Sequence, residues 1–261
     1  MPITEQGIYY EIADYTDPWR EPPLVPTVLL HHGFGRSLNF WREWVPLLAR
    51  DCRVVRMDAR GCGRSRVPAQ GEPYTLDGMV EDALSVLDAL QLQQVHWGAE
   101  ASGGHVGLAL ALKHPQRVAS LTLCNTPFKL PQSANDNFSE AEVEQHGLGF
   151  WARKTLANRI DMDKVSGEWK EWSIAEHDKT PPHVAIAQHA MIAAGDLLPL
   201  LPRVNAPVLV MADPSWARVA LGATVEARGR LAPGEGDVAA VLDPRSEEHT
   251  SELQSRFGIS Y

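Results

Sequence analysis

The stretch QVHWGAEASGGHVGLALALKHP, residues 94–115, decides the fold. Residues 94–97 predict a short strand that runs directly into a turn of small residues, 98–104. Residues 106–113 are mostly apolar and predict a buried helix that ends near Pro115. A strand that enters a helix through so short a turn is typical of proteins in which strands and helices alternate and the strands lie parallel.

The same alternation extends on both sides of this stretch. Amphipathic spacing of i, i+3 and i+4 predicts a helix from Val80 to Leu90, and residues 40–49 indicate another. Further strands are predicted at residues 25–30, 52–57, 118–124 and 207–211. We therefore predict the α/β class, with a mostly parallel, doubly wound sheet that is covered by helices on both faces.

Residues 130–203 break this rhythm. They are rich in charge and helical in character, and the Pro181-Pro182 pair divides them. We predict a helical lid (cap domain) inserted between two strands of the core. The expected domains are therefore residues 1–129 as the first part of the core, 130–203 as the lid, 204–244 as the end of the core and 245–261 as a tail.

Composition and charge exclude several classes of protein. Apolar residues make up 44% and charged residues 22%, as in globular domains rather than disordered chains. The net charge is −9, which argues against a nucleic-acid or anionic-membrane partner. The three cysteines, Cys52, Cys62 and Cys124, form no CxxC pair, so we expect no disulfide framework and a cytoplasmic location. We find no signal-peptide pattern, metal motif or nucleotide-binding loop, and expect no metal and no cofactor.

Four segments together resemble the α/β-hydrolase family. His31-His32-Gly33-Phe34-Gly35 resembles the family's oxyanion loop, and residues 58–65 (DARGCGRS) resemble its D-x-R-G-x-G-x-S turn. Residues 99–104 resemble the nucleophile elbow, and residues 114–127 resemble the helix end and strand that follow it. Within the family the chain is most similar to small bacterial, lid-bearing esterases and enol-lactonases. The resemblance implies hydrolysis of a carboxylic ester or lactone through an acyl-enzyme, by a serine, a histidine and a carboxylate with two backbone N–H groups.

The chain departs from this pattern at the nucleophile. Gly103 and Gly104 fix the frame of the elbow, and the nucleophile position then falls on Ala101. Alanine has no nucleophilic atom, whether it is a natural or an engineered replacement. Ser102 is the alternative nucleophile, but that frame places Glu100 where a small residue is required and moves the hydroxyl onto the next residue of the helix.

Other parts of the family's site have candidates here. The resemblance implies an oxyanion hole formed by the N–H groups of Phe34 and Ser102, and we expect Phe34 and Trp151 to bind substrate. Asp213 is a possible triad acid, although it comes about two residues early. The last histidine, His249, stands in a sequence context that does not match the family, so we assign it no role. His105 is expected to be a packed helix residue.

The function expected from these residues is that of an α/β-hydrolase that binds a small ester or lactone. Ala101 and the missing triad histidine predict little hydrolytic activity in this chain, so whether it is an enzyme stays open. One alternative is cofactor-independent, non-covalent chemistry in the same cleft. Another is a non-catalytic protein that binds a small molecule.

The C-terminal residues look foreign to the fold. Residues 245–255 (RSEEHTSELQS) resemble the translation of a common sequencing adapter, and residues 213–244 are poor in family features. We therefore expect an altered reading frame, a truncated domain and an incomplete C-terminal edge of the sheet. The strand at 207–211 would then have an unpaired edge.

The first prediction concerns this tail. Deletion of residues 245–261 should change the free energy of unfolding by no more than about 0.5 kcal/mol, because a segment with so few apolar residues adds little burial. Urea unfolding of the full chain and of the 1–244 variant measures this difference. A protease-resistant fragment that reaches Tyr261 would contradict the prediction.

Overall fold

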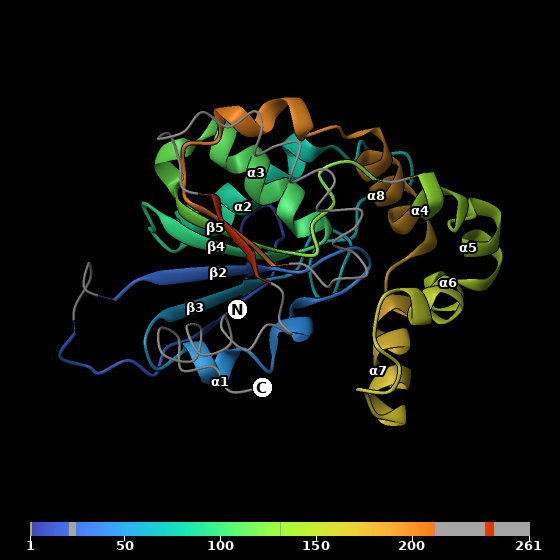
Figure 1. The fold of residues 1–261 in the computed structure, drawn as a ribbon, viewed down its shortest axis with the longest axis horizontal. Helices are drawn as coiled ribbons and strands as arrows, with labels where there is room; N and C mark the ends of the chain where they lie inside the picture. Colours follow the sequence, from blue (N-terminus) through green and yellow to red (C-terminus); the bar gives the residue numbers. More distant parts are fainter. Residues whose placement is uncertain (1, 21–24, 131, 212–237, 243–261) are drawn as a thin grey trace.

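A computed structural model of the chain describes residues 2–20, 25–130, 132–211 and 238–242. These residues build a seven-stranded sheet with the strand order β1-β3-β2-β4-β5-β6-β7. Helices cover both faces of the sheet, and a group of helices extends from one end of it (Figure 1). The predicted α/β class and the mostly parallel, doubly wound sheet are confirmed.

The strands pair in parallel except at the first one. β1 runs antiparallel to β3, and each of the other neighbouring pairs in the described sheet is parallel. The strands are β1 (Tyr10–Ala13), β2 (Thr27–His31), β3 (Arg53–Met57), β4 (Val95–Glu100), β5 (Val118–Cys124), β6 (Val208–Met211) and β7 (Val238–Leu242).

The helices fall into two groups. The core helices are α1 (Val45–Leu48), α2 (Leu76–Ala89) and α3 (Ser102–Lys113). Between β5 and β6 lie α4 (Gln132–Asp136), α5 (Glu140–His146), α6 (Leu148–Thr155), α7 (Gly167–Asp178) and α8 (Pro182–Ala194), which we call the helical insert. Short 3-10 helices occur at Leu38–Trp41, Pro115–Arg117, Leu156–Asn158 and Leu198–Arg203.

The central strands are buried on both faces, which explains their continuous apolar sequence. Leu29 belongs to the large core under α2 and α3, whereas its neighbour Leu30 belongs to a smaller core on the opposite face. Val55 and Val54 of the adjacent strand divide in the same way. Alternate residues of a strand point to opposite faces, so a strand covered on both sides must be apolar throughout.

Two sequence expectations were wrong. The single helix expected at 40–49 is instead a 3-10 helix, Leu38–Trp41, followed by the four-residue α1. Pro46 explains the break, because it lacks an N–H group and is tolerated only in the first turn of an α-helix. The unpaired edge expected at residues 207–211 is also absent, since β7 pairs in parallel with β6. The expectation of an incomplete edge rests on residues 213–261. The structure describes only β7 within that range.

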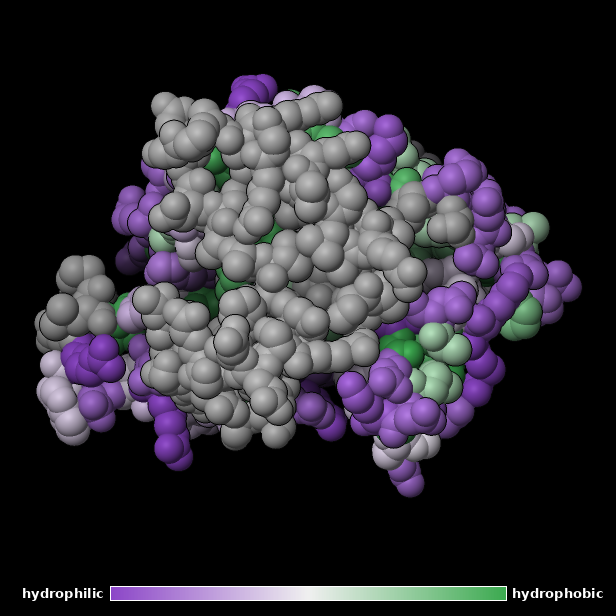
Figure 2. All heavy atoms as spheres, in the orientation of Figure 1, coloured by the Kyte–Doolittle hydropathy of each residue, from purple (hydrophilic) through white to green (hydrophobic). Residues whose placement is uncertain are grey.

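The helical insert has an inner apolar side and an outer polar side. Val143, Leu148 and Ala185 are fully buried and pack with Phe34 of the core. The outward surface of the insert, at the right of Figure 2, is mostly hydrophilic. None of the described helices is both long and apolar enough to span a lipid bilayer.

Glycines at the start of α3 allow the helix to lie against the strands. A Cβ atom on Gly103 would lie 2.6 Å from the carbonyl oxygen of His31 and 2.7 Å from that of His32. A Cβ atom on Gly104 would lie 2.1 Å from the Thr126 hydroxyl oxygen. Real side chains do not approach so closely, so glycine at both positions is a packing requirement of this turn.

We predict that Gly103→Ala destabilises the fold by about 2 kcal/mol or more, because the backbone of His31 and His32 cannot move away cheaply. Gly167→Ala is the matched control, since a Cβ atom there would meet nothing within 4 Å. Thermal unfolding of the two variants against the parent measures the difference. Equal midpoints for both variants would contradict the packing argument.

Candidate active site

Ala101 occupies a strained turn between β4 and α3. Its φ of 47° and ψ of −117° lie in a region that residues with a side chain rarely adopt. Its N–H group donates to the Cys124 carbonyl at 2.9 Å, and its carbonyl accepts from Gly104 N–H at 3.0 Å. Such strain persists where the surrounding structure enforces it, and it is concentrated at functional sites.

The loop after β2 lies directly against this turn. A Cβ atom on Gly33 would lie 3.0 Å from Ala101 Cβ and 2.0 Å from Glu100 Oε2. The neighbouring Phe34 therefore lies beside Ala101. Ser102 is the first residue of α3, where a helix leaves N–H groups without intrahelical partners. This arrangement supports the predicted oxyanion hole of Phe34 and Ser102 N–H groups, which stays a prediction.

Two buried histidines hold the loop in place. His32 accepts a hydrogen bond from Ala59 N–H through Nε2 at 2.9 Å and donates from Nδ1 to the Gly33 carbonyl at 2.8 Å. His31 donates from Nδ1 to the His32 carbonyl at 2.8 Å and stacks on Trp97. Burial lowers the pKa of His31 to about 4, and burial together with the nearby His31 lowers the pKa of His32 to about 3. Both rings are neutral at physiological pH, and their role is structural.

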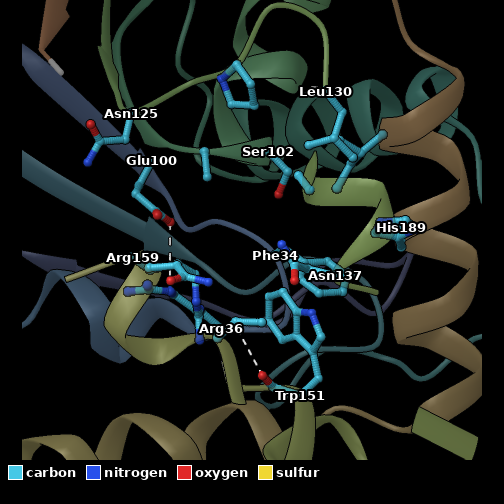
Figure 3. A pocket seen from close by; sticks show the side chains of 16 residues that line it. Phe34, Arg36, Glu100, Ser102, Asn125, Leu130, Asn137, Trp151, Arg159 and His189 are labelled. Carbon is cyan, nitrogen blue, oxygen red and sulfur yellow. Dashed lines mark hydrogen bonds and ion pairs between the residues drawn. The ribbon is translucent and has the colours of Figure 1, made fainter. Parts of the chain in front are cut away.

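A cavity of about 390 Å³ opens onto Ala101 and Ser102. The core contributes one wall and the helical insert contributes the other (Figure 3). Phe34 and Trp151, which we expected to bind substrate, both line it and meet edge to face with ring centres 5.1 Å apart. The remaining lining residues are Arg36, Glu100, Asn125, Pro127, Leu130, Ala134, Asn137, Thr155, Asn158, Arg159, His189 and Ile192.

Several polar atoms of this lining have no hydrogen-bond partner among the described residues. They are Glu100 Oε2, Ser102 Oγ, Trp151 Nε1, Arg159 Nε and His189 Nε2. A buried polar atom without a partner costs free energy, so most such atoms in proteins are satisfied. Water or a bound polar molecule in the cavity can complete their hydrogen bonding.

The sequence analysis missed three charged or titratable lining residues. Arg36 follows Phe34 by two positions, so the motif itself could have pointed to it. Arg159 and His189 come from the helical insert, and no pattern in the sequence links them to the elbow. Burial lowers the pKa of His189, which is therefore neutral at physiological pH.

The sequence analysis also considered Asp213, His249 and His105. Asp213 and His249 lie outside the described residues. His105 is buried, and its Nε2 atom donates to the Pro127 carbonyl, so the expectation of a packed helix residue is confirmed. Burial lowers the pKa of His105 as well. Within the described residues no group of three histidine, cysteine, aspartate or glutamate side chains could hold a metal ion.

Residues 26–158, which carry the elbow and the loop against it, match the family model of the alpha/beta hydrolase fold. The chain belongs to the α/β-hydrolase family. Matches to individual curated proteins cover a shorter part of the chain at higher identity, or most of it at lower identity. The chain is 40% identical over 122 residues to the protein named "Putative carbamate hydrolase RutD" of Caulobacter segnis, over 47% of this chain and 44% of that protein. The chain thus spans less than half the length of this curated relative.

Longer matches have lower identity. The RutD protein of Yersinia enterocolitica is 25% identical over 243 residues, which is 82% of this chain and 84% of that protein. A hydrolase from Pseudomonas aeruginosa superposes with a TM-score of 0.74 at 27% identity, over 95% of this chain and 91% of that one. The enol-lactonase of Burkholderia xenovorans superposes with a TM-score of 0.75 at 22% identity, over 95% and 94%, and shares the fold.

The buried histidines predict acid sensitivity of this α/β hydrolase. The unfolded chain takes up protons near pH 6.5 at His31 and His32, whereas the folded pKa values are about 4 and about 3. Below pH 6.5 the unfolded state therefore binds more protons than the folded state, and the free energy of unfolding decreases as the pH is lowered. Asp58 opposes this loss in part, because burial raises its pKa to about 6.

We expect the free energy of unfolding to be lower at pH 4.5 than at pH 7 by roughly 2 kcal/mol. Urea unfolding followed by tryptophan fluorescence measures it. His32→Gln should flatten the pH dependence, and the same change at the exposed His146 should leave it as it is. A chain that is as stable at pH 4.5 as at pH 7 would show that these histidines are not buried as neutral rings.

Proposed function

We propose that this α/β hydrolase binds a small carbonyl compound, a carboxylic ester, lactone or carbamate, in the cavity at Ala101 and does not hydrolyse it through an acyl-enzyme. The observation that carries the proposal is the residue at the strained turn. Ala101 has the backbone strain of an elbow and opens onto the cavity, but its methyl group has no atom that can attack a carbonyl. The names of the relatives, carbamate hydrolase and enol-lactonase, point to the same class of ligand.

The surrounding groups retain their binding role under this proposal. A ligand carbonyl oxygen placed over Ala101 can accept hydrogen bonds from the N–H groups of Phe34 and Ser102. The aromatic rings of Phe34 and Trp151 cover the apolar part of the ligand. In a family member with serine at this position, the hydroxyl would attack the carbonyl carbon and its proton would pass to a histidine. In this chain the alanine at position 101 cannot form a bond to an acyl group.

His189 favours a second candidate, non-covalent chemistry in the same cavity. Its ring stacks on Phe138 at a centre-to-centre distance of 3.9 Å, and its Nε2 atom is buried beside the cavity with no partner among the residues that the structure describes. A neutral imidazole in this position can accept a proton from a bound water or ligand. Such a reaction would need no group at position 101.

We also propose a cytoplasmic location and no nucleic-acid or membrane partner. The three cysteines are free, with Cys52 and Cys62 buried, and burial raises the thiol pKa of Cys62 to about 12. Buried thiols of this kind are inert packing groups and suit a reducing compartment.

The test is hydrolysis of p-nitrophenyl acetate and p-nitrophenyl butyrate. We expect turnover no greater than that of the heat-denatured protein, because loss of the nucleophile alone costs several orders of magnitude. Ala101→Ser alone should not restore turnover, since the sequence offers no histidine in the family's context. A nitrophenol burst followed by steady turnover in the parent chain would contradict the proposal. Turnover that His189→Gln abolishes would establish the second candidate instead.

A further inference from the structure

We propose that the cavity selects ligands that carry a carboxylate in addition to the ester or lactone carbonyl, and that Arg159 and Arg36 bind this carboxylate. The inference rests on the proposed function and names the substrate class of the same cavity. It depends on three observations: how Arg159 is held, which charges face it, and where they lie relative to Ala101.

Arg159 is held by contacts to both of its terminal nitrogens and to the face of its guanidinium group. Its Nη2 atom donates to the Ala152 carbonyl at 3.0 Å, and its Nη1 atom donates to His177 Nε2 at 3.2 Å. Its guanidinium lies over the Trp151 ring, with the central carbon 4.6 Å from the ring centre. The Nε atom is buried and has no partner in the described part of the chain. The orientation of the guanidinium group is therefore fixed. Arg159 lines the cavity, so the Nε–H group is available to a ligand bound there.

His177 supports this arrangement as a neutral ring. Its Nδ1 atom donates to the Ser173 carbonyl at 2.7 Å, which leaves the lone pair of Nε2 to accept from Arg159. Burial, followed by the charges of Arg36 and Arg159, lowers the pKa of His177 well below its ordinary value. His177 is thus a positioning residue that fixes Arg159 and adds no positive charge.

Among the described residues, the charges at this end of the cavity do not balance. Arg36 and Arg159 are cations, and Glu100 is the carboxylate that faces them. Arg36 Nε lies 3.9 Å from Glu100 Oε2, too far for a hydrogen bond, and its guanidinium also contacts the Phe40 ring. Burial and the charge of Arg36 lower the pKa of Arg159 to about 9, against the opposing effect of Glu100. A buried excess cation is costly, and a ligand anion would neutralise it.

The donor set decides between a carboxylate and a cationic ligand. Within the described part of the chain, Arg159 Nε and Trp151 Nε1 have no partner and can only donate, whereas Glu100 Oε2 has no hydrogen-bond partner and can only accept. An anion with two oxygens uses both donors and the net positive charge. Arginine binds such planar anions through paired N–H groups, which adds geometric selectivity.

The charged group lies beside the position where a carbonyl would be held. Glu100 directly precedes Ala101, and Arg36 follows the loop residue Phe34 by two positions. Figure 3 shows Glu100, Arg36 and Arg159 on one side of the cavity, with Leu130 and His189 on the other. A ligand with its carbonyl at Ala101 can therefore place a carboxylate, a few atoms away, against the two arginines.

The test compares two methyl esters that differ in one charge. Monomethyl glutarate carries a carboxylate, and dimethyl glutarate carries none. Isothermal titration calorimetry of the full chain should give binding of the monoester at least about 10-fold tighter than of the diester, as expected for charge-assisted hydrogen bonds. Arg159→Met keeps an apolar stem over Trp151 and should remove this preference by weakening monoester binding by about 10-fold. Arg36→Met should reduce the preference for the monoester.

Arg153→Met is the matched control. Arg153 lies on α6 close to Arg159 in sequence but is exposed, and it pairs with the exposed Glu171 at 2.6 Å. This variant should keep the full preference for the monoester. Thermal unfolding without ligand shows whether each variant is folded. If Arg159→Met does not fold, Arg159→Lys takes its place. Lysine keeps the charge without the paired N–H groups of arginine and should reduce the preference for the monoester. The carboxylate site is then tested by Arg159→Lys together with Arg36→Met.

The outcomes separate this inference from the proposed function. Equal affinity for the two esters, or a preference that survives both Arg159→Met and Arg36→Met, overturns the carboxylate site and leaves ester binding intact. Binding of neither ester overturns both proposals. Methanol release, followed in the same samples by proton NMR, overturns the proposed lack of hydrolysis, and the monoester-to-diester ratio of KM values then tests the carboxylate site.

Discussion

The arrangement of the candidate site depends on close packing around the turn at Ala101. Ala101 adopts a positive φ between β4 and α3. A Cβ atom on Gly33 would meet Ala101 and Glu100, and a Cβ atom on Gly103 would meet the His31 and His32 carbonyl oxygens. This crowding brings the loop after β2, the end of β4 and the start of α3 to one point. The opening of the cavity lies at that point, and so does the proposed oxyanion hole of the Phe34 and Ser102 N–H groups.

The two layers of the site have different origins. The core contributes the loop that the neutral His31 and His32 hold, and its N–H group at Phe34 is proposed to bind a carbonyl oxygen. The helical insert contributes side chains, Trp151, Arg159 and His189, which are suited to a particular ligand. Under the two proposals, the carbonyl position belongs to the core, and selectivity depends on Arg36 of the core together with Arg159 of the insert.

Residue patterns predicted the core well, because strands buried on both faces leave a clear apolar signal. Residues 118–124 are the strand β5 as predicted. The turn expected at 98–104 is much shorter, because β4 extends to Glu100 and α3 begins at Ser102. The helix expected at 40–49 was wrong because Pro46 interrupts it, and an apolar pattern alone does not report a missing N–H group. The pairing of β6 with β7 was missed because strand pairing joins residues far apart in the sequence.

What the sequence by itself determined is the α/β class, the α/β-hydrolase resemblance and the alanine at the nucleophile position, because each follows from local spacing or residue identity. The candidate lining residues Phe34 and Trp151 could also be named in advance. Only the tertiary structure brought Arg36, Glu100 and Arg159 together, since they come from a loop, a strand end and the helical insert. Electrostatic contact between such segments depends on distance in space, and no local pattern encodes it.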